Sequence, residues 1–184
     1  ECILFFKGSR KLYLRKEKNM NEALLENLKI DIFADGASLS QISKQNNINW
    51  VKGFTTNPTL MKKNGIKDYK SFAFEVMQLV NNKPVSFEVF SDDLDEMLDQ
   101  AYEIASWHEN INVKIPITNT KSEYTSRIIE KLNGAKIKCN ITALFTIEQI
   151  VRVLDIINDD TFTIISIFAG RIADSGLDPM PIMR

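Results

Sequence analysis

The chain has 184 residues, of which 44% are hydrophobic and 26% are charged, and it holds only 7 glycines and 5 prolines. This is an ordinary globular composition, which excludes a disordered chain, a collagen-like fibre and a low-complexity linker. The length corresponds to a single domain. A formal net charge of −1 and a pI near 6.0 argue against a generic nucleic-acid surface.

The cysteine and histidine content limits the chemistry further. Two widely separated cysteines, Cys2 and Cys139, provide neither a disulfide framework nor a zinc site, so we expect a reducing cytoplasm. The single histidine, His108, excludes a His-rich metal site. The early apolar run at residues 2–6 is too short for a signal sequence or a membrane span, so we expect no membrane association.

Residues 1–19 differ in charge from the rest of the chain. They carry six basic and two acidic side chains, whereas residues 20–184 carry 17 basic and 22 acidic ones. The first methionine is Met20, and a helical pattern opens at residues 21–25. We therefore expect residues 1–19 to be a leader outside the native fold, with residues 20–184 as the folded domain. A genuine basic arm is the alternative.

Beyond residue 28, short strand-like runs alternate with amphipathic helical patterns. The runs are rich in β-branched and aromatic residues, whereas the helical patterns repeat their apolar residues at a helical period. Glycine at Asn133-Gly134 is expected to close one of the helices. The predicted strands are 29–36, 50–57, 84–90, 111–118, 137–144 and 162–169, and the predicted helices are 69–81, 94–107, 123–132 and 147–157. Strict alternation predicts parallel strands joined by right-handed crossovers, and therefore the α/β class.

Polar residues recur along these strands, near the strand ends, at regular spacing. Glu88, Lys114, Asn140 and Ser166 follow one another at intervals of 26 residues. Because side chains alternate between the two faces of a strand, one face is apolar and the other collects polar groups. A doubly wound sheet covers both faces with helices, whereas a (β/α) barrel turns one face toward its axis, so we predict a TIM-type barrel. No glycine-rich phosphate motif follows any strand, which argues against nucleotide binding.

Lys114 is the most informative single residue. It lies between Val113 and Ile115 in a predicted buried strand, although lysine is rarely buried. Burial disfavours the ammonium, and a neutral amine attacks carbonyls to form a Schiff base. The alternative is a buried ion pair with a carboxylate. Lys138 and Lys52 lie early in their strands and are weaker candidates.

Two carboxylates accompany this lysine in the pattern. Asp35 ends the first predicted strand, and Glu88 lies within an apolar run between Phe87 and Val89. Schiff-base chemistry requires several proton transfers, which two carboxylates in different environments can divide between them. A turn residue ahead of Gly36 is the alternative reading of Asp35.

Six sequence blocks resemble those of one known protein family, and they occur in the same order and with similar spacing. They are IFADGA at residues 32–37, GFTTNPTL at 53–60, SFEV at 86–89, NVKIPIT at 112–118, KCNIT at 138–142 and ISIFAGRI at 165–172. Together they resemble the transaldolase family, whose members are class I aldolase-type (β/α)8 barrels. The resemblance implies transfer of a dihydroxyacetone unit from a ketose phosphate (sedoheptulose 7-phosphate or fructose 6-phosphate) to an aldose phosphate (glyceraldehyde 3-phosphate or erythrose 4-phosphate), as in the pentose phosphate pathway.

The resemblance also implies catalytic roles. Lys114 would form the Schiff base with C2 of the ketose. Asp35 would take the proton of the C4 hydroxyl as the carbon–carbon bond breaks. Glu88 and Thr142 would hold the water that relays protons during imine formation. Neither a metal nor an organic cofactor is implied, because the protonated imine is itself the electron sink.

Substrate-binding roles follow in the same way. Asn57 and Asn140 would orient the hydroxyls of the three-carbon unit, and Ser166 and Arg171 would bind the phosphate, for which arginine offers a fork of donors. The implied partners are sugar phosphates, with no nucleic acid or membrane. A homo-oligomer is possible.

The subtype and the completeness of the barrel remain open. Relatives that act as fructose 6-phosphate aldolases carry tyrosine at the position of Phe168 and glutamine at that of Glu88, so both residues favour transfer. Only six βα units are counted where the family has eight, and we expect residues 29–36 and 162–169 to be open edges. The alternatives are therefore a fructose 6-phosphate aldolase-type enzyme, a truncated inactive fragment, or an aldolase acting on deoxyribose or keto-acid substrates.

Overall fold

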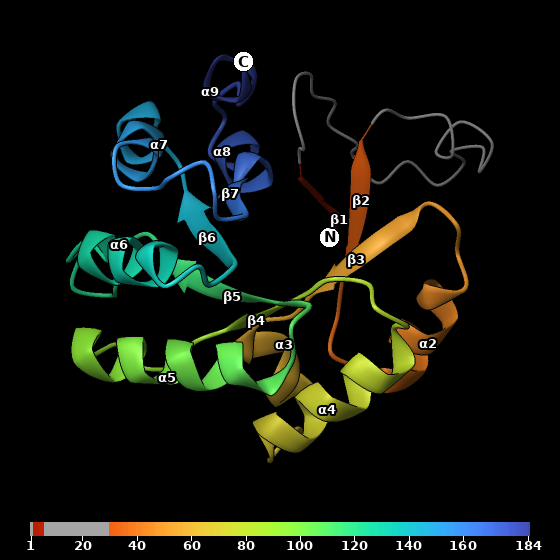
Figure 1. The fold of residues 1–184 in the computed structure, drawn as a ribbon. Coiled ribbons are helices and arrows are strands. Elements are labelled where there is room, and N and C mark those ends of the chain that lie inside the picture. Colours follow the sequence, from red (N-terminus) through yellow and green to blue (C-terminus); the bar gives the residue numbers. More distant parts are fainter. Residues whose placement is uncertain (1, 6–29) are drawn as a thin grey trace. The chain divides into compact units, whose positions relative to one another are not determined.

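A computed structural model describes residues 2–5 and 30–184 of the chain. The described chain falls into two compact units. Of the described residues, the first unit comprises 2–5, 30–87 and 107–111, and the second comprises 88–106 and 112–184. In both units, each parallel strand of the ribbon leads into a helix (Figure 1).

The first unit contains a sheet in which the strands neighbour one another in chain order. β1 pairs with β2 antiparallel, whereas β2 with β3 and β3 with β4 are parallel. The elements are β1 (Cys2–Phe5), β2 (Asp31–Asp35), α2 (Leu39–Asn46), β3 (Val51–Thr55), α3 (Pro58–Lys63), α4 (Tyr69–Leu79) and β4 (Val85–Glu88), whose last residue belongs to the second unit.

The second unit repeats the pattern. β5 pairs with β6 and β6 with β7, both parallel and in chain order. The elements are α5 (Leu94–Trp107), whose last residue belongs to the first unit, β5 (Ile111–Pro116), α6 (Ser126–Gly134), β6 (Cys139–Leu144), α7 (Ile147–Leu154), β7 (Thr163–Ile167), α8 (Ala169–Asp174) and α9 (Met180–Met183).

This topology confirms the predicted fold class. Six of the described strands, β2 to β7, alternate with helices, and within each unit every parallel strand lies beside the next one in the chain. A doubly wound sheet reverses its strand order at a switch point, whereas a (β/α) barrel keeps one direction throughout. The chain is therefore α/β, with the six βα units of an incomplete (β/α) barrel.

Several predicted boundaries are wrong by a few residues, and four short helices, α2, α3, α8 and α9, escaped prediction. The strands are shorter than their apolar runs because hydrogen-bonded pairing stops before the run does. The predicted helix 123–132 begins instead at Ser126, because Tyr124 forms an isolated bridge with Thr118 that holds the preceding segment as a loop.

The predicted glycine cap of α6 is also wrong. Gly134 is the last helical residue, and Lys136 takes the left-handed conformation, with φ of 60°. Its amide donates to the Asn133 carbonyl, and the Ile137 amide donates to the Leu132 carbonyl. These two hydrogen bonds form a Schellman motif, which ends a helix with one residue in the left-handed conformation. Glycine is usual at that position, and here the residue is a lysine.

The first expected open edge is covered by the chain itself. β1 lies antiparallel along β2 with Cys2 opposite Ala34 and Phe5 opposite Asp31, so the expectation for residues 29–36 is wrong. Residues 6–29 lie outside the described residues, and they include most of the proposed leader and the helical pattern at 21–25. The boundary at residue 19 therefore stays a prediction.

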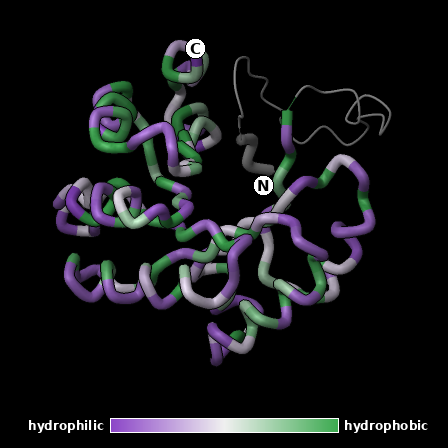
Figure 2. The backbone as a smooth tube through the Cα atoms, in the orientation of Figure 1, coloured by the Kyte–Doolittle hydropathy of each residue, from purple (hydrophilic) through white to green (hydrophobic). Residues whose placement is uncertain are grey.

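The cores of the two units consist of the apolar faces of their strands and helices. Hydrophobic and hydrophilic residues interleave along the helices (Figure 2). In the first unit the rings of Tyr69, Phe72 and Trp107 contact Phe87 edge-on. In the second unit Ile115, Ile141 and other β-branched residues are fully buried, which leaves the opposite sheet face for polar groups. Within the described residues, every helix is too short or too polar to span a lipid bilayer.

Candidate functional site

Lys114 is buried in the second unit, on the polar face of β5. It is 3% exposed, and its neighbours Val113 and Ile115 are 0% exposed on the opposite, apolar face. Lys138 and Lys52, the other two lysines considered, are both exposed. Lys114 is the only buried lysine in the described parts of the chain.

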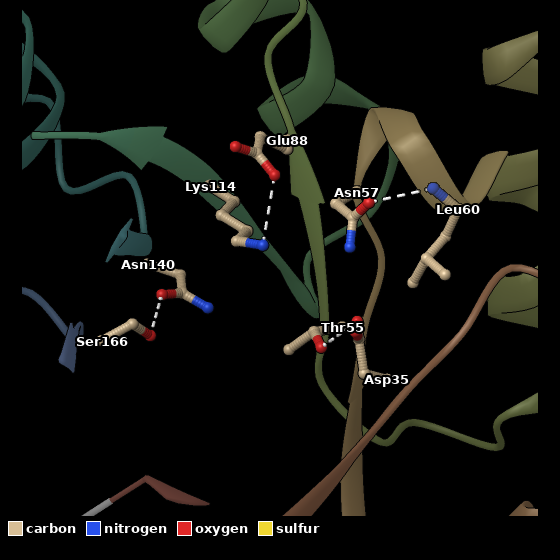
Figure 3. Close-up of polar contacts among 8 residues, drawn as sticks. All are labelled: Asp35, Thr55, Asn57, Leu60, Glu88, Lys114, Asn140 and Ser166. Carbon is tan, nitrogen blue, oxygen red and sulfur yellow. Dashed lines mark hydrogen bonds and ion pairs between the residues drawn. The ribbon is translucent and has the colours of Figure 1, made fainter. Parts of the chain in front are cut away.

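A carboxylate faces this lysine. Glu88 Oε2 lies 3.1 Å from Lys114 Nζ, and the two side chains are 18% and 4% exposed (Figure 3). The backbone supports the pair, because the Val89 amide donates to the Lys114 carbonyl at 3.2 Å. The ion pair that the sequence left open as an alternative is present. A carboxylate at this distance is also placed to exchange a proton with the amine.

A second polar pair lies on the same face of this sheet. Asn140 pairs in register with Lys114, so the two side chains share a face. The Ser166 hydroxyl donates to Asn140 Oδ1 at 2.7 Å, and both residues are buried (Figure 3). Because the Ser166 hydroxyl donates to Asn140 Oδ1, the Asn140 side chain is held with its Nδ2 pointing away from Ser166.

Thr142 completes this polar face. It is 1% exposed, and its hydroxyl has no hydrogen-bond partner among the described residues. In the register of β5 with β6, Thr142 lies opposite Pro116. This pair is two positions beyond the pair of Lys114 with Asn140, so Thr142 lies on the same face of β6 as Asn140. A buried hydroxyl is energetically costly unless a hydrogen-bond partner satisfies it, and a water or a substrate could be that partner for Thr142.

Arg171 and Phe168 follow β7. Arg171 is exposed in the short helix α8 and Phe168 is its N-cap residue. The ring of Phe168 packs edge-on against Phe145, with centroids 5.6 Å apart. Arginine at this point is available to an anion from solvent, and the two rings make the adjoining surface apolar.

The first unit holds Asp35 and Asn57. Asp35 ends β2, and its Oδ1 accepts a hydrogen bond of 2.8 Å from the Thr55 hydroxyl (Figure 3). Asn57 is the N-cap of α3, where its Oδ1 accepts from the Leu60 amide at 2.9 Å. The cap occupies the oxygen of Asn57, so its amide nitrogen is the group left to donate.

Thr55 was missed by the sequence reasoning. It is 1% exposed and pairs in register with Asp35, so its hydroxyl orients that carboxylate. The available signal was its place inside the predicted strand 50–57, two residues before Asn57 in the GFTTNPTL block and therefore on the same strand face as Asn57.

The expectation that each polar residue lies near a strand end holds for only part of the set. Glu88 and Asp35 are the last residues of β4 and β2, and Ser166 is the next to last of β7. Lys114 is the fourth of six residues in β5, and Asn140 is the second of six in β6. Constant spacing along the chain does not fix a position in the strand, because the strands start at different points of their βα units.

The site groups therefore separate into three contacts. The structure brings Lys114 together with Glu88 and Asn140 together with Ser166 in the second unit, and Asp35 together with Thr55 in the first. Sequential parallel strands with a buried lysine and carboxylate on a polar sheet face define the class, an α/β protein of the (β/α)-barrel kind.

Comparison with known proteins agrees with this class. The family model described as transaldolase/fructose-6-phosphate aldolase matches residues 32–181. A protein of Dehalococcoides mccartyi named "Probable transaldolase" is 40% identical over 153 residues, which cover 83% of this chain and 67% of the relative. "Probable transaldolase" proteins of Streptococcus agalactiae and Roseiflexus castenholzii are 38% and 36% identical, covering 83% and 84% of this chain and 66% and 67% of theirs.

The chain belongs to the transaldolase/fructose-6-phosphate aldolase family. It spans about two thirds of the length of the curated relatives it matches.

Proposed function

We propose that this protein is a transaldolase that works through a Schiff base on Lys114. The observation that carries the proposal is a buried lysine, 3% exposed, with a carboxylate 3.1 Å from its nitrogen, in a chain of this family. The neighbouring carboxylate can take a proton from the ammonium, which leaves the amine free to attack a ketone.

In the proposed reaction, Lys114 Nζ adds to C2 of a ketose phosphate, and loss of water leaves a protonated imine. The water leaves with protons relayed by Glu88 and by a water molecule held between Glu88 and the Thr142 hydroxyl, which has no hydrogen-bond partner among residues 2–5 and 30–184. A base then takes the C4 hydroxyl proton, the C3–C4 bond breaks, and its electron pair moves to the imine nitrogen. The aldose phosphate departs, and the enamine left on the lysine adds to an aldose phosphate acceptor.

The remaining assignments are also part of this proposal. Asp35, oriented by Thr55, is the base for the C4 hydroxyl, and Asn57 and Asn140 donate to the hydroxyls of the three-carbon unit. Arg171 binds the phosphate. Ser166 shares that role by the family resemblance, and to donate to a phosphate its one hydroxyl hydrogen must leave Asn140 Oδ1, which it holds in this structure.

Transfer is preferred over free aldol cleavage in the proposal. Phe168 packs on Phe145 and brings no hydroxyl to the end of β7, and Glu88 places a carboxyl group beside Lys114 where a glutamine would place an amide. The substrates are the ketose and aldose phosphates of the pentose phosphate pathway, without metal or organic cofactor. The proposed setting is the cytoplasm, and assembly into a homo-oligomer is compatible with it.

Borohydride trapping tests the proposal. Incubation with fructose 6-phosphate and then borohydride should add a three-carbon unit at Lys114, located by peptide mass spectrometry. Lys114→Arg should abolish the adduct, because guanidinium stays protonated. Lys138→Arg, which changes an exposed lysine, is the matched control and should leave trapping intact.

Two outcomes would contradict the proposal. An adduct at Lys138 instead of Lys114 would overturn the assignment, and a folded chain that traps nothing would overturn the activity. Adding erythrose 4-phosphate distinguishes the enzyme types, because a transaldolase releases a seven-carbon ketose phosphate whereas an aldolase releases free dihydroxyacetone.

A further inference from the structure

β6 carries an extra residue relative to its neighbour. Ile141 pairs with Ile165 and Leu144 pairs with Ile167, so β6 advances three residues where β7 advances two. Thr142 and Ala143 together therefore lie opposite Ser166. This is the geometry of a β-bulge, which bends a strand and redirects its side chains.

Ala143 has the backbone conformation of such a bulge. Its φ is 61°, in the left-handed region that side chains other than glycine and asparagine rarely adopt. Other described non-glycine residues with positive φ, such as Asn81 and Lys136, lie in turns, whereas Ala143 lies inside a strand. Strain of this kind persists only where the surrounding structure imposes it, and it concentrates at functional sites.

The bulge allows Thr142 and Leu144, which are two residues apart, to point to opposite faces of the sheet. In a regular strand, Asn140, Thr142 and Leu144 would all point to one face, because residues two apart share a face. Leu144 is instead fully buried and shares the apolar face of Ile141, through its pairing with Ile167. The extra residue returns Leu144 to the core and leaves Thr142 on the face of Asn140.

The bulge sets the position of the Thr142 hydroxyl. It is buried, and it has no hydrogen-bond partner in the part of the chain that the structure describes. The Thr142 carbonyl accepts from the Ile117 amide at 2.9 Å, and the Leu144 carbonyl accepts from the Phe168 amide at 2.8 Å. Neighbouring strands thus hold the backbone on both sides of Ala143, which fixes the direction of the threonine.

We infer that Ala143 is a positioning residue, whose left-handed bulge presents the Thr142 hydroxyl on the Lys114 face of the sheet. The inference rests on the proposed function for the purpose of that hydroxyl, which is to hold the proton-relaying water during imine formation. The bulge itself does not depend on that function.

The first experiment tests the bulge without catalysis. Ala143→Gly should melt at a higher temperature than the unsubstituted chain, because glycine adopts positive φ without strain. Ala34→Gly is the matched control and should melt lower, because Ala34 is a strand alanine whose φ is not positive. If Ala143→Gly also melts lower, Ala143 is not in the left-handed conformation and the inference falls.

The second experiment reads the threonine directly. In threonine-methyl NMR spectra, the Thr142 signal is identified by its loss in Thr142→Val. It should keep its position in Ala143→Gly and move in Ala143→Val, because a β-branched residue is strongly disfavoured at positive φ. An unmoved signal in a folded Ala143→Val protein would overturn the positioning role, whether or not the chain has activity.

The third experiment links the bulge to the lysine. Ala143→Val should slow borohydride trapping at Lys114 roughly tenfold or more, since small misplacements of reacting groups are costly. In a Thr142→Val background the same substitution should have little further effect, and Ala143→Gly should trap normally. Equal slowing in both backgrounds would show that Ala143 does not act through Thr142. If the unsubstituted chain traps nothing, the proposed function fails, while melting and NMR still decide the bulge and the threonine position.

Discussion

Breaking the Lys114–Glu88 pair from the two sides should have unequal effects on stability. At 3.1 Å, the gross attraction of two unit charges is about 5 kcal/mol at an effective dielectric constant of 20. Most of this attraction offsets the cost of removing the charges from water. The difference between variants therefore depends on how buried the remaining charge is.

Glu88→Gln leaves the ammonium of Lys114, whose side chain is 4% exposed, without its counter-charge. Loss of one partner of a buried pair costs roughly 3–5 kcal/mol, and we expect about 3 kcal/mol because the glutamine oxygen still accepts a hydrogen bond. Lys114→Met leaves Glu88, which is 18% exposed and therefore better solvated, so we expect about 1–2 kcal/mol.

Urea denaturation followed by circular dichroism measures these free energies of unfolding. Lys114→Met combined with Glu88→Gln removes both charges and should lie within about 1 kcal/mol of the unsubstituted chain, which makes the two substitutions strongly non-additive. Lys138→Met, at an exposed position, should change stability by less than about 0.5 kcal/mol. Additive effects, or a larger loss for Lys114→Met than for Glu88→Gln, would refute the reasoning.

Three further predictions concern other parts of the chain. Burial raises the pKa of the Cys139 thiol to about 12, so iodoacetamide at pH 8 should alkylate it only as fast as the protein unfolds, as measured by peptide mass spectrometry; rapid alkylation of the folded chain would contradict its burial. Gly53→Ala should destabilise the chain by about 1–3 kcal/mol in urea, because the added Cβ would lie 2.2 Å from the buried Phe33 ring, and an unchanged midpoint would show that the ring can move. Arg171→Ala should weaken binding of phosphorylated ligands roughly tenfold or more in calorimetry, and an equal loss for unphosphorylated analogues would exclude a phosphate role.

The alternation of side chains along a strand made most of the polar face predictable. Lys114 between Val113 and Ile115, and Asn140 between Cys139 and Ile141, point away from an apolar core in any regular strand. That property is local, so it can be derived from neighbouring residues alone. Which residues then touch depends on register between strands, which the sequence does not state.

The contacts that escaped prediction depend on register or on local strain. Thr55 orients Asp35 because β2 and β3 align these two residues side by side. Ala143 and Lys136 both adopt positive φ although neither is a glycine, so the residue type does not predict the left-handed conformation at either position. At Ala143 the pairing of β6 with β7 overrides the local preference, whereas at Lys136 the hydrogen bonds that end α6 do so.

The sequential strand order has a consequence for how the chain is made. In the second unit, paired strand residues lie close along the chain, as with Val113 and Cys139, 26 positions apart, and Cys139 and Thr163, 24 apart. Every such pairing closes a loop of nearly constant, modest length, and the entropic cost of closure rises only slowly with length. As the chain leaves the ribosome, each strand meets its partner after one more βα unit has emerged, so the sheet of this unit can grow strand by strand during synthesis.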